Sequence, residues 1–171
     1  RFIYSVGDKT DADVVITEIG GTIGDMESQP FIEAIRQVSL EQAKEDVLFI
    51  HVTLVPYIPG SDEYKSKPTQ HSVKELQGMG IAPDIIVLRA DEPIERDVMD
   101  KIAMFCNIRK ECVIENRTLS LLYEVPLMLE KQKLGQTVCN KLRLKAEKAQ
   151  LDDWKKMVKK AKHPTKTVTI G

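Results

Sequence analysis

The sequence lacks several features that mark specialised classes of protein. Its cysteines, Cys106, Cys112 and Cys139, are odd in number and show no CxxC spacing, which argues against a disulfide framework and against a zinc site. No apolar run approaches the roughly 20 residues that span a bilayer. A formal net charge of −1 gives the chain no polyelectrolyte character that would attract nucleic acid or an anionic membrane. We therefore expect neither of these partners.

The two ends of the chain also lack familiar features. The chain opens RFIYSVGDKT, with Arg1 where a methionine would stand and without the pattern of a signal peptide, so we expect a cytoplasmic protein. RFIYSVGD has the pattern of the last turns of a helix that ends at Gly7. The final residues, KTVTIG, have the pattern of a strand that has only begun. We interpret the chain as a piece of a longer protein.

What is present fits one ordinary α/β domain. The 171 residues are 42% hydrophobic and 30% charged, a composition typical of a globular protein with a core. Apolar, β-branched runs predict strands at 13–19, 47–55, 84–89 and 111–116. The first three runs are almost continuously apolar, as in strands that are covered on both faces.

Helical spacing of apolar residues predicts helices between and after these strands, over 30–38, 71–80, 95–106, 119–133, 136–144 and 151–162. Ser72 and Glu75 form a capping-box pattern, and Pro126 is expected to break or kink its helix. Such alternation predicts a parallel sheet with flanking helices. Ligands of these folds bind beyond the carboxyl ends of the strands, so the loops that follow strands are the places to search.

The first such loop reads EIGGTIGDMES and runs from Glu18 to Ser28. An acid at the carboxyl end of a buried strand is a common ligand for magnesium in nucleotide-hydrolysing folds, and Gly20, Gly21 and Gly24 would let a backbone approach a ligand. A glycine-rich connector with carboxylates near a helix start explains the same residues. No GxxxxGK[ST] phosphate loop occurs in the chain. The pattern leaves both interpretations open.

Other charged residues are less informative by themselves. Lys65 and Lys67 precede a predicted helix, where ammonium groups and free N–H groups would suit a polyphosphate, although most such lysines are simply solvated. Nothing in the pattern selects Lys101. His51 lies within an apolar run and is interpreted as a core histidine. The basic segment WKKMVKKAKHPTK predicts a docking helix with a solvated lysine face, followed by a linker at Pro164.

Four segments of the chain resemble the CTP synthase family, in order and over nearly the whole length. They are ADVVITEIGGTIGDMESQPFIEAIRQ, FIHVTLVPYI, KSKPTQHSVKELQGMGIAPDIIVLR and YEVPLMLEKQ. The resemblance implies part of an amidoligase domain with a P-loop NTPase fold like that of dethiobiotin synthetase, incomplete at its N-terminal side. It assigns 1–163 to the second half of this domain. It assigns 164–171 to a linker and the first strand of a glutaminase domain.

The activity that the resemblance implies is the conversion of UTP to CTP. ATP phosphorylates the 4-oxygen of UTP, with Mg²⁺ as cofactor, and ammonia from glutamine displaces the phosphate. Members of the family form homotetramers with nucleotide sites at the subunit interfaces. CTP inhibits it at the UTP site. The expected partners are therefore UTP, CTP, ATP, further copies of the chain and a glutaminase domain of the same polypeptide.

The resemblance also implies roles for individual residues. Glu18 matches the magnesium ligand, and Asp25, Met26 and Glu27 match a segment that contacts the pyrimidine nucleotide. Lys65, Ser66, Lys67, Pro68, Thr69 and Gln70 match the KTKPTQ segment of the family, in which the two lysines bind UTP phosphates and support the transfer. Lys101 matches a further nucleotide-binding lysine. Arg117, Thr118 and Leu119 fall where the family contacts adenine, although the family commonly reads KDV there.

Some parts of the family pattern are missing or altered. The P-loop and a second magnesium-binding aspartate would precede Arg1, and the glutaminase nucleophile would follow Gly171, so we expect the isolated chain to be inactive. PGSDEY replaces a stretch before Lys65 that is rich in alanine and glycine. Two alternatives stay open: a non-catalytic fragment that binds nucleotide or joins oligomers, and another ligase of the dethiobiotin-synthetase-like group.

Overall fold

A computed structural model describes residues 2–166 and 169, and its centre is a parallel sheet of three strands. The strands are β1 (Ile50–Leu54), β4 (Ile85–Ala90) and β5 (Val113–Arg117), in the order β1-β4-β5. In the register of the sheet, Ile50 lies beside Ile85 and Ile86 lies beside Val113. A two-stranded antiparallel hairpin, β2 (Tyr57–Ile58) and β3 (Glu63–Tyr64), follows β1. The predicted strands at 84–89 and 111–116 are thus confirmed within one or two residues.

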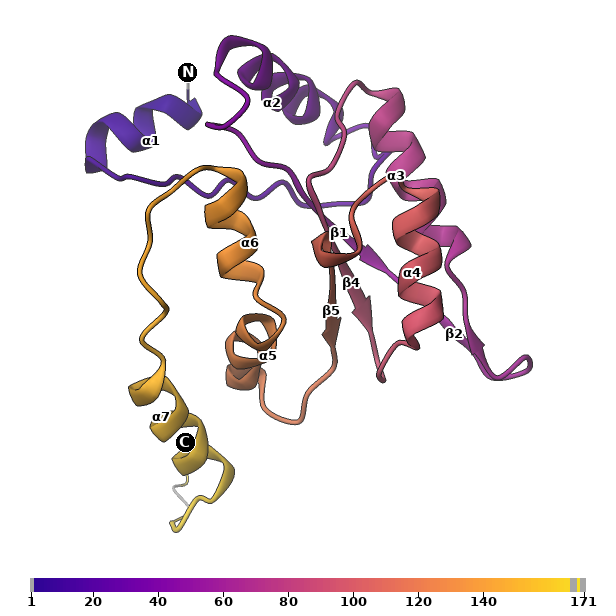
Figure 1. Ribbon diagram of the computed structural model, residues 1–171, viewed down its shortest axis with the longest axis vertical. Helices are drawn as coiled ribbons and strands as arrows, with labels where there is room; N and C mark the ends of the chain where they lie inside the picture. Colours follow the sequence, from indigo (N-terminus) through magenta and orange to yellow (C-terminus); the bar gives the residue numbers. More distant parts are fainter. Residues whose placement is uncertain (1, 167–168, 170–171) are drawn as a thin grey trace.

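Seven α-helices accompany the sheet in the described part of the chain (Figure 1). They are α1 (Phe2–Thr10), α2 (Gln29–Glu41), α3 (Lys67–Gly78), α4 (Arg96–Phe105), α5 (Val125–Lys131), α6 (Leu134–Lys141) and α7 (Asp152–Lys162). Helices α3 and α4 lie on one side of the strands, and α5 and α6 lie on the other (Figure 1). The fold is therefore α/β with a parallel sheet and flanking helices, as predicted.

Two apolar clusters hold these layers together, one on each face of the sheet. In the first, Ile86 and Leu88 of β4 pack with Val73 of α3 and Ile102 of α4. In the second, Ile85, Val87 and Ile114 pack against Leu129 of α5 and Val138 of α6. Alternate residues of β4 point to opposite faces, and both sets are buried. This two-sided burial explains why β4 reads as a continuous apolar run.

The prediction of a strand at 13–19 is wrong. These residues run as extended chain without joining either sheet of the described part, and Ile16 is 91% exposed. A strand needs a neighbour to pair its N–H and C=O groups. Within the described residues, β1 pairs only with β4 and offers no partner to 13–19. Apolar, β-branched composition predicts the tendency to extend but not the presence of a partner.

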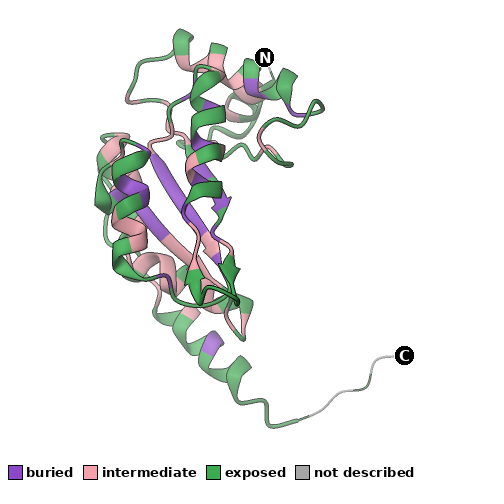
Figure 2. Ribbon diagram, turned by 90° about the vertical axis from the view of Figure 1, so that its right-hand side faces the viewer, coloured by how far each residue is buried: buried purple, intermediate pink, exposed green. Residues whose placement is uncertain are grey.

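Strand β1 also differs from the prediction, because only one of its faces is covered. His51 and Thr53 are buried, whereas Ile50, Val52 and Leu54 are exposed. The register places these three residues on the face of Ile85 and Val87, which α5 and α6 cover farther along the sheet. Figure 2 shows that the buried residues, in purple, gather in the strands of the sheet, whereas the surrounding helices are largely green. The helices of that face stop short of β1 and leave an apolar strip on the surface.

Three predicted helix boundaries are also wrong. Helix α3 begins at Lys67 with Pro68 in its first turn, so Ser72 and Glu75 lie inside the helix and form no capping box. Pro126 likewise occupies the first turn of α5, where its fixed φ angle suits the start of a helix, and it does not break one. Helix α1 continues through Gly7, which a helix tolerates at a cost of about 1 kcal/mol.

His51 links β1 to α3 and is the core histidine that the sequence predicts. Its side chain is 7% exposed, and its Nε2 lies 2.8 Å from Ser72 Oγ in a hydrogen bond. Burial lowers the pKa of His51 below its usual value of 6.5, because a buried imidazole resists taking up charge. His51 is therefore neutral in the folded protein at neutral pH.

This lowered pKa predicts a pH dependence of folding. Below pH 6.5 the unfolded chain binds a proton at His51 that the folded chain resists, so the contribution of His51 to stability is present above that pH and is lost as the pH falls. We expect the free energy of unfolding, measured by urea denaturation, to decline less between about pH 7.5 and about pH 5.5 in His51→Gln than in wild type. Equal declines would contradict the assignment.

Helix α7 docks on the chain segment between β5 and α5, as the sequence predicts. Trp154 donates a hydrogen bond from Nε1 to the carbonyl oxygen of Tyr123 at 2.7 Å, and the two rings pack edge to face. Val158 is buried, and Lys162 forms an ion pair with Glu124. The expected strand over KTVTIG includes residues 167, 168, 170 and 171, which lie outside the described residues. No helix in the described ranges is long and apolar enough to cross a membrane.

Candidate functional site

The carboxyl edge of the sheet brings together two of the three predicted groups of site residues. Lys65 follows the β2–β3 hairpin, and its N–H donates to the carbonyl oxygen of Pro56, just beyond β1. Tyr64 Oη accepts a hydrogen bond from the N–H of Glu92 at 2.9 Å, which ties the hairpin to the loop after β4. Arg117 ends β5 at the same edge. The segments 65–70 and 117–119 thus share the edge at which α/β folds bind ligands.

The segment from Lys65 to Gln70 forms the start of α3 and faces solvent only in part. Lys67 and Pro68 are exposed. Thr69 is fully buried, and its hydroxyl donates to the carbonyl oxygen of Leu54 at 3.3 Å. Ser66 is buried and accepts a hydrogen bond from Gln70 Nε2 at 3.0 Å. The side chains of Ser66 and Thr69 are therefore used in hydrogen bonds that stabilise the start of the helix. A ligand would contact these two residues through their backbone groups.

Lys65 pairs with an acid, Glu63, that the sequence analysis did not select. Lys65 Nζ forms an ion pair with Glu63 Oε1, on β3. That ion pair lowers the pKa of Glu63, and the nearby positive charge of Lys101, on α4, lowers it further. One of the predicted phosphate-binding lysines, Lys65, thus pairs with this carboxylate, and the charge of a second, Lys101, acts on it. The only hint in the sequence is the spacing of Glu63 and Lys65, which places two residues on one side of an extended chain.

The predicted adenine-contacting residues are held in place by Arg89, which the sequence analysis also missed. Arg89 ends the apolar run of β4 and donates from Nη1 to the carbonyl oxygen of Asn116 at 3.0 Å and from Nη2 to Thr118 Oγ1 at 3.1 Å. Thr118 in turn donates its hydroxyl to Asp91 at 3.2 Å and its N–H to the carbonyl oxygen of Ala90 at 2.9 Å. The residues after β5 are therefore tied to the end of β4.

We expect Arg89→Ala to loosen this segment. Loss of these hydrogen bonds should speed exchange of the Thr118 amide hydrogen by about fivefold or more, since one net hydrogen bond is worth about 1 kcal/mol. Hydrogen exchange followed by NMR measures the rate. Arg96→Ala, which removes an exposed arginine of α4 that pairs with Asp100, is the control and should leave the Thr118 amide unchanged. An unchanged rate in Arg89→Ala would show that other contacts hold the segment.

The third predicted group, Glu18 with Asp25, Met26 and Glu27, lies elsewhere. Ile19 and Ile23 pack with Leu76 and Ile81, at the end of α3 and before β4. A side chain at Gly24 would meet Glu75 Oε1 at 3.4 Å, and Glu75 lies eight residues beyond Lys67, about 12 Å along the helix axis. The expectation that Glu18 ends a strand of the sheet is wrong, because 13–19 pairs with no strand of the described chain.

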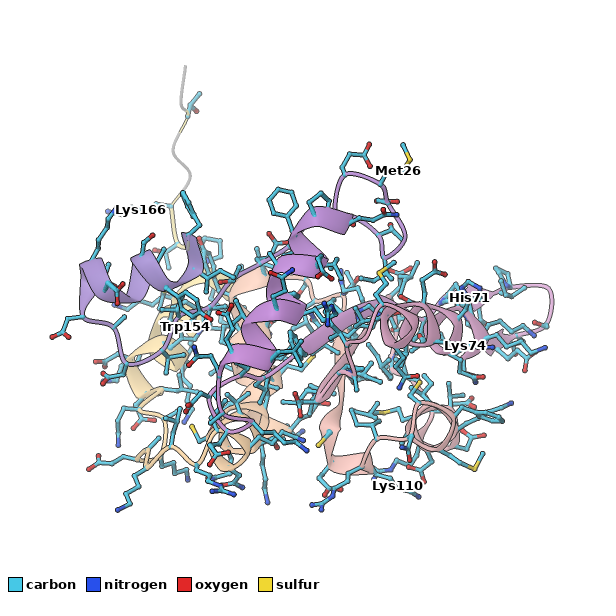
Figure 3. All side chains as sticks on the ribbon, turned by 90° about the horizontal axis from the view of Figure 1, so that it is seen from above. Met26, His71, Lys74, Lys110, Trp154 and Lys166 are labelled. Carbon is cyan, nitrogen blue, oxygen red and sulfur yellow. The ribbon has the colours of Figure 1, made fainter. Side chains whose placement is uncertain are left out.

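The predicted site residues of this loop have exposed side chains and differ in their hydrogen bonding. Asp25 Oδ2 accepts the N–H of Thr22 at 2.7 Å, so this carboxylate closes a turn. Met26 is 79% exposed and points away from the protein in Figure 3. Glu27 and Glu18 are exposed as well. Within residues 2–166 and 169, no three acidic, histidine or cysteine side chains come together to hold a metal ion.

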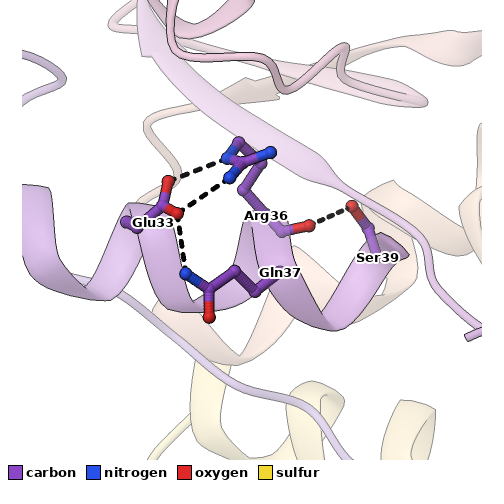
Figure 4. A network of polar contacts seen from close by, with 4 residues as sticks. All are labelled: Glu33, Arg36, Gln37 and Ser39. Atoms are coloured by element: carbon purple, nitrogen blue, oxygen red, sulfur yellow. Dashed lines mark hydrogen bonds and ion pairs between the residues drawn. The ribbon is translucent and has the colours of Figure 1, made fainter. Parts of the chain in front are cut away.

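Helix α2, which follows this loop, contains an ion pair between Arg36 and Glu33. The guanidinium donates to both carboxylate oxygens of Glu33 at 2.8 Å, and Gln37 Nε2 donates to the same carboxylate (Figure 4). These two donors lower the pKa of Glu33 to about 2, the Arg36 hydrogen bond being the larger cause. Arg36 Cδ lies 3.0 Å from where a Cβ on Gly80 would stand. Gly80, with a φ of 86°, therefore lets α2 approach the turn after α3.

A cavity of about 540 Å³ lies between α1, α2 and the residues around Glu18. Apolar side chains, including Phe2, Phe31 and Val38, form much of its wall. This lining offers few donors to phosphate. The loop from Glu18 to Glu27 packs against the later turns of α3, whereas Lys65 precedes the first turn of that helix.

Comparison with known proteins identifies the family. The family model described as "CTP synthase N-terminus" matches residues 1–144. The chain is 53% identical over 169 residues to CTP synthase of Ruminiclostridium cellulolyticum and 52% identical over 169 residues to that of Bacillus subtilis, covering 99% of this chain and 32% of each relative. The enzyme of Symbiobacterium thermophilum is 54% identical over 170 residues, which are 99% of this chain and 31% of that protein. The chain thus spans about a third of the length of these curated relatives, and it belongs to the CTP synthase N-terminus family.

Proposed function

We propose that this chain is part of the amidoligase domain of a CTP synthase, a ligase that converts UTP to CTP. In the proposed reaction, ATP transfers a phosphoryl group to the 4-oxygen of UTP, and ammonia then displaces phosphate at that carbon. The observation that carries the proposal is the place of Lys65 beyond β1, at the carboxyl edge of the sheet and next to the start of α3. Positive side chains and a helix N-terminus at that edge suit a nucleoside triphosphate.

The roles of the lysines follow from the charge of the substrates. Phosphoryl transfer between two triphosphates crowds negative charge, and catalysis depends on neutralising that charge and aligning the acceptor. Lys65 and Lys67 supply ammonium groups, and the N–H groups in the first turn of α3 lack partners within the helix. Lys101 adds a third positive charge from α4. Among the residues of this segment, Ser66 and Thr69 support the helix start rather than contact the ligand through their side chains.

Glu18 is proposed as a ligand of Mg²⁺. The ion fits an exposed carboxylate, since Mg²⁺ commonly binds through one or two carboxylates, water and substrate phosphates rather than through a cage of protein ligands. The ion would neutralise phosphate charge during the transfer. Arg117, Thr118 and Leu119 are proposed to contact the adenine of ATP, and Arg89 and Asp91 fix their position.

The separation of the two predicted halves favours a nucleotide site shared between chains. Asp25, Met26 and Glu27 lie beside the later turns of α3, while Lys65 precedes its first turn. We propose that the loop 25–27 of one chain and the segment 65–70 of another contact the same pyrimidine nucleotide in a homotetramer. UTP as substrate and CTP as inhibitor would share this site.

The proposed activity requires more polypeptide than these 171 residues contain. The relatives are about three times as long, and the exposed apolar side chains of Ile50, Val52 and Leu54 suit further chain packed on β1. A glutaminase domain of the same polypeptide would supply ammonia. The isolated chain, which has no GxxxxGK[ST] sequence, is proposed to be inactive, and at most to bind nucleotide.

The test is an assay of both forms with ATP, UTP, Mg²⁺ and ammonia, analysed by chromatography. The full-length polypeptide is expected to form CTP and ADP together in a one-to-one ratio, and the purified 171-residue chain is expected to form neither. Full-length protein that hydrolyses ATP without aminating UTP would favour another ligase of the dethiobiotin-synthetase-like group. CTP formed by the isolated chain would contradict its proposed inactivity.

A further inference from the structure

Glu63 is the carboxylate that pairs with Lys65, one of the proposed phosphate-binding lysines. It lies on β3, two residues before Lys65, and its carboxylate forms the ion pair with Lys65 Nζ. The positive charge of Lys101, on helix α4, also lowers the pKa of Glu63. Glu63 and Lys65 are both about half exposed, with 54% and 41% of their side chains accessible. The group is thus open to a ligand from solvent.

The carboxylate of Glu63 and a phosphate would use the same donors. An ammonium group offers three N–H donors and no acceptor, and a carboxylate next to it uses part of this capacity and cancels part of the positive charge. Glu63 therefore has two opposed effects. It holds Lys65 Nζ in place through the ion pair, and it weakens the attraction of this ammonium group for a phosphate.

We propose that Glu63 sets the affinity of the pyrimidine-nucleotide site by competing with the triphosphate for Lys65, with which it forms an ion pair. This inference rests on the proposed function of the site and adds a residue to it. UTP and CTP carry the same triphosphate and differ only in the base, so the competition acts on both alike. Glu63 thus lowers the affinity for substrate and for inhibitor by the same factor and does not discriminate between them.

The test uses Glu63→Gln in the full-length protein, which removes the charge and keeps the shape of the side chain. UTP and CTP are titrated separately in the presence of Mg²⁺, by calorimetry, at low and at high salt. At low salt we expect both dissociation constants to fall about fourfold, the effect of removing one unit charge about 5 Å from a phosphate in a medium as polar as water. High salt screens exposed charges, so the difference from wild type should largely vanish there.

The matched control is Glu33→Gln on α2. It removes the same charge from a carboxylate that also pairs with a basic side chain, Arg36, but that lies on a different element from Lys65 and Lys101. We expect wild-type affinity for both nucleotides in this variant. Equal tightening in Glu33→Gln would mean that net charge alone is responsible and would overturn the inference.

The remaining outcomes separate the inference from the function on which it rests. Unchanged or weaker binding in Glu63→Gln, or tightening for only one of the two nucleotides, would overturn the competition while leaving the site in place. A purely structural role of Glu63 predicts weaker binding, the opposite sign. Glu63→Ala, which also removes the side-chain bulk, should tighten binding in the same direction. Wild-type protein that binds neither nucleotide would contradict the proposed function itself, and the inference with it.

Discussion

Replacing Lys65 with alanine is expected to lower the rate of CTP formation by the full-length protein by about 100-fold or more. Loss of one group that stabilises negative charge in a transition state typically costs that much. Lys65 lies at the carboxyl edge and pairs with Glu63, on which the charge of Lys101 also acts. Within the segment 65–70, only Lys67 carries another positive charge. The initial rate with ammonia as the nitrogen source measures the effect without involving glutamine hydrolysis.

Lys74→Ala is the matched control for this prediction. Lys74 lies on α3, the helix that Lys65 precedes, and is exposed (Figure 3), so its loss removes an equal charge about two turns from the start of the helix. We expect it to keep the wild-type rate within about twofold, as for an exposed charge far from the reacting groups. A Lys65→Ala variant that retains a rate close to that of Lys74→Ala would contradict the role of Lys65.

The second large effect concerns the core. We expect Leu88→Ala to lower the free energy of unfolding of the 171-residue chain by about 3 kcal/mol, the usual cost of removing a buried leucine side chain. Leu88 is fully buried on β4 and packs in the cluster that joins the sheet to α3 and α4. Urea denaturation, with the slope compared between variants, measures the loss.

Leu54→Ala provides the comparison, because it makes the same chemical change on the neighbouring strand, close to Leu88. Leu54 is 61% exposed on β1 and lies beside Arg89 in the register. We expect a loss of less than about 0.5 kcal/mol in the 171-residue chain, as for most surface substitutions. Equal losses in the two variants would mean that the apolar strip of β1 is covered in this chain, contrary to the structure.

The sequence predicts the parts of the fold that depend on local pattern and burial together. Strand β4 and the helices that flank it follow from a continuous apolar run and from helical spacing, because those residues are buried on the faces that the pattern indicates. The segment 13–19 has an equally apolar pattern but no partner strand in the described chain. Pattern shows what a segment can bury and does not show whether something is there to bury it.

The helix boundaries were misread for a related reason. Ser72 and Glu75 match a capping box, but Ser72 is used in the hydrogen bond to His51 instead. The true start of α3 is marked by Pro68, a residue suited to the first turn of a helix. A local motif has several uses for the same side chain, and tertiary contacts decide between them.

The candidate site was predictable in part. The loop position of Lys65 and Lys67 follows from their place after a strand and before a helix, while Lys101 is selected only by resemblance to the family. Glu63 and Arg89 act through neighbours that are distant in sequence, such as Lys101 and Thr118. No pattern along the chain reveals contacts of that kind.

The most direct test of the central claim, that one nucleotide site combines the loop 25–27 of one chain with Lys65 of another, is a mixing experiment. Full-length Glu27→Ala and Lys65→Ala proteins, each of low activity, are dissociated, mixed in equal amounts and allowed to reassociate. If the site is shared, random assembly leaves about a quarter of the sites with both halves intact, and CTP formation should recover to about that fraction of the wild-type rate. A mixture that remains as inactive as its two components would contradict the shared site.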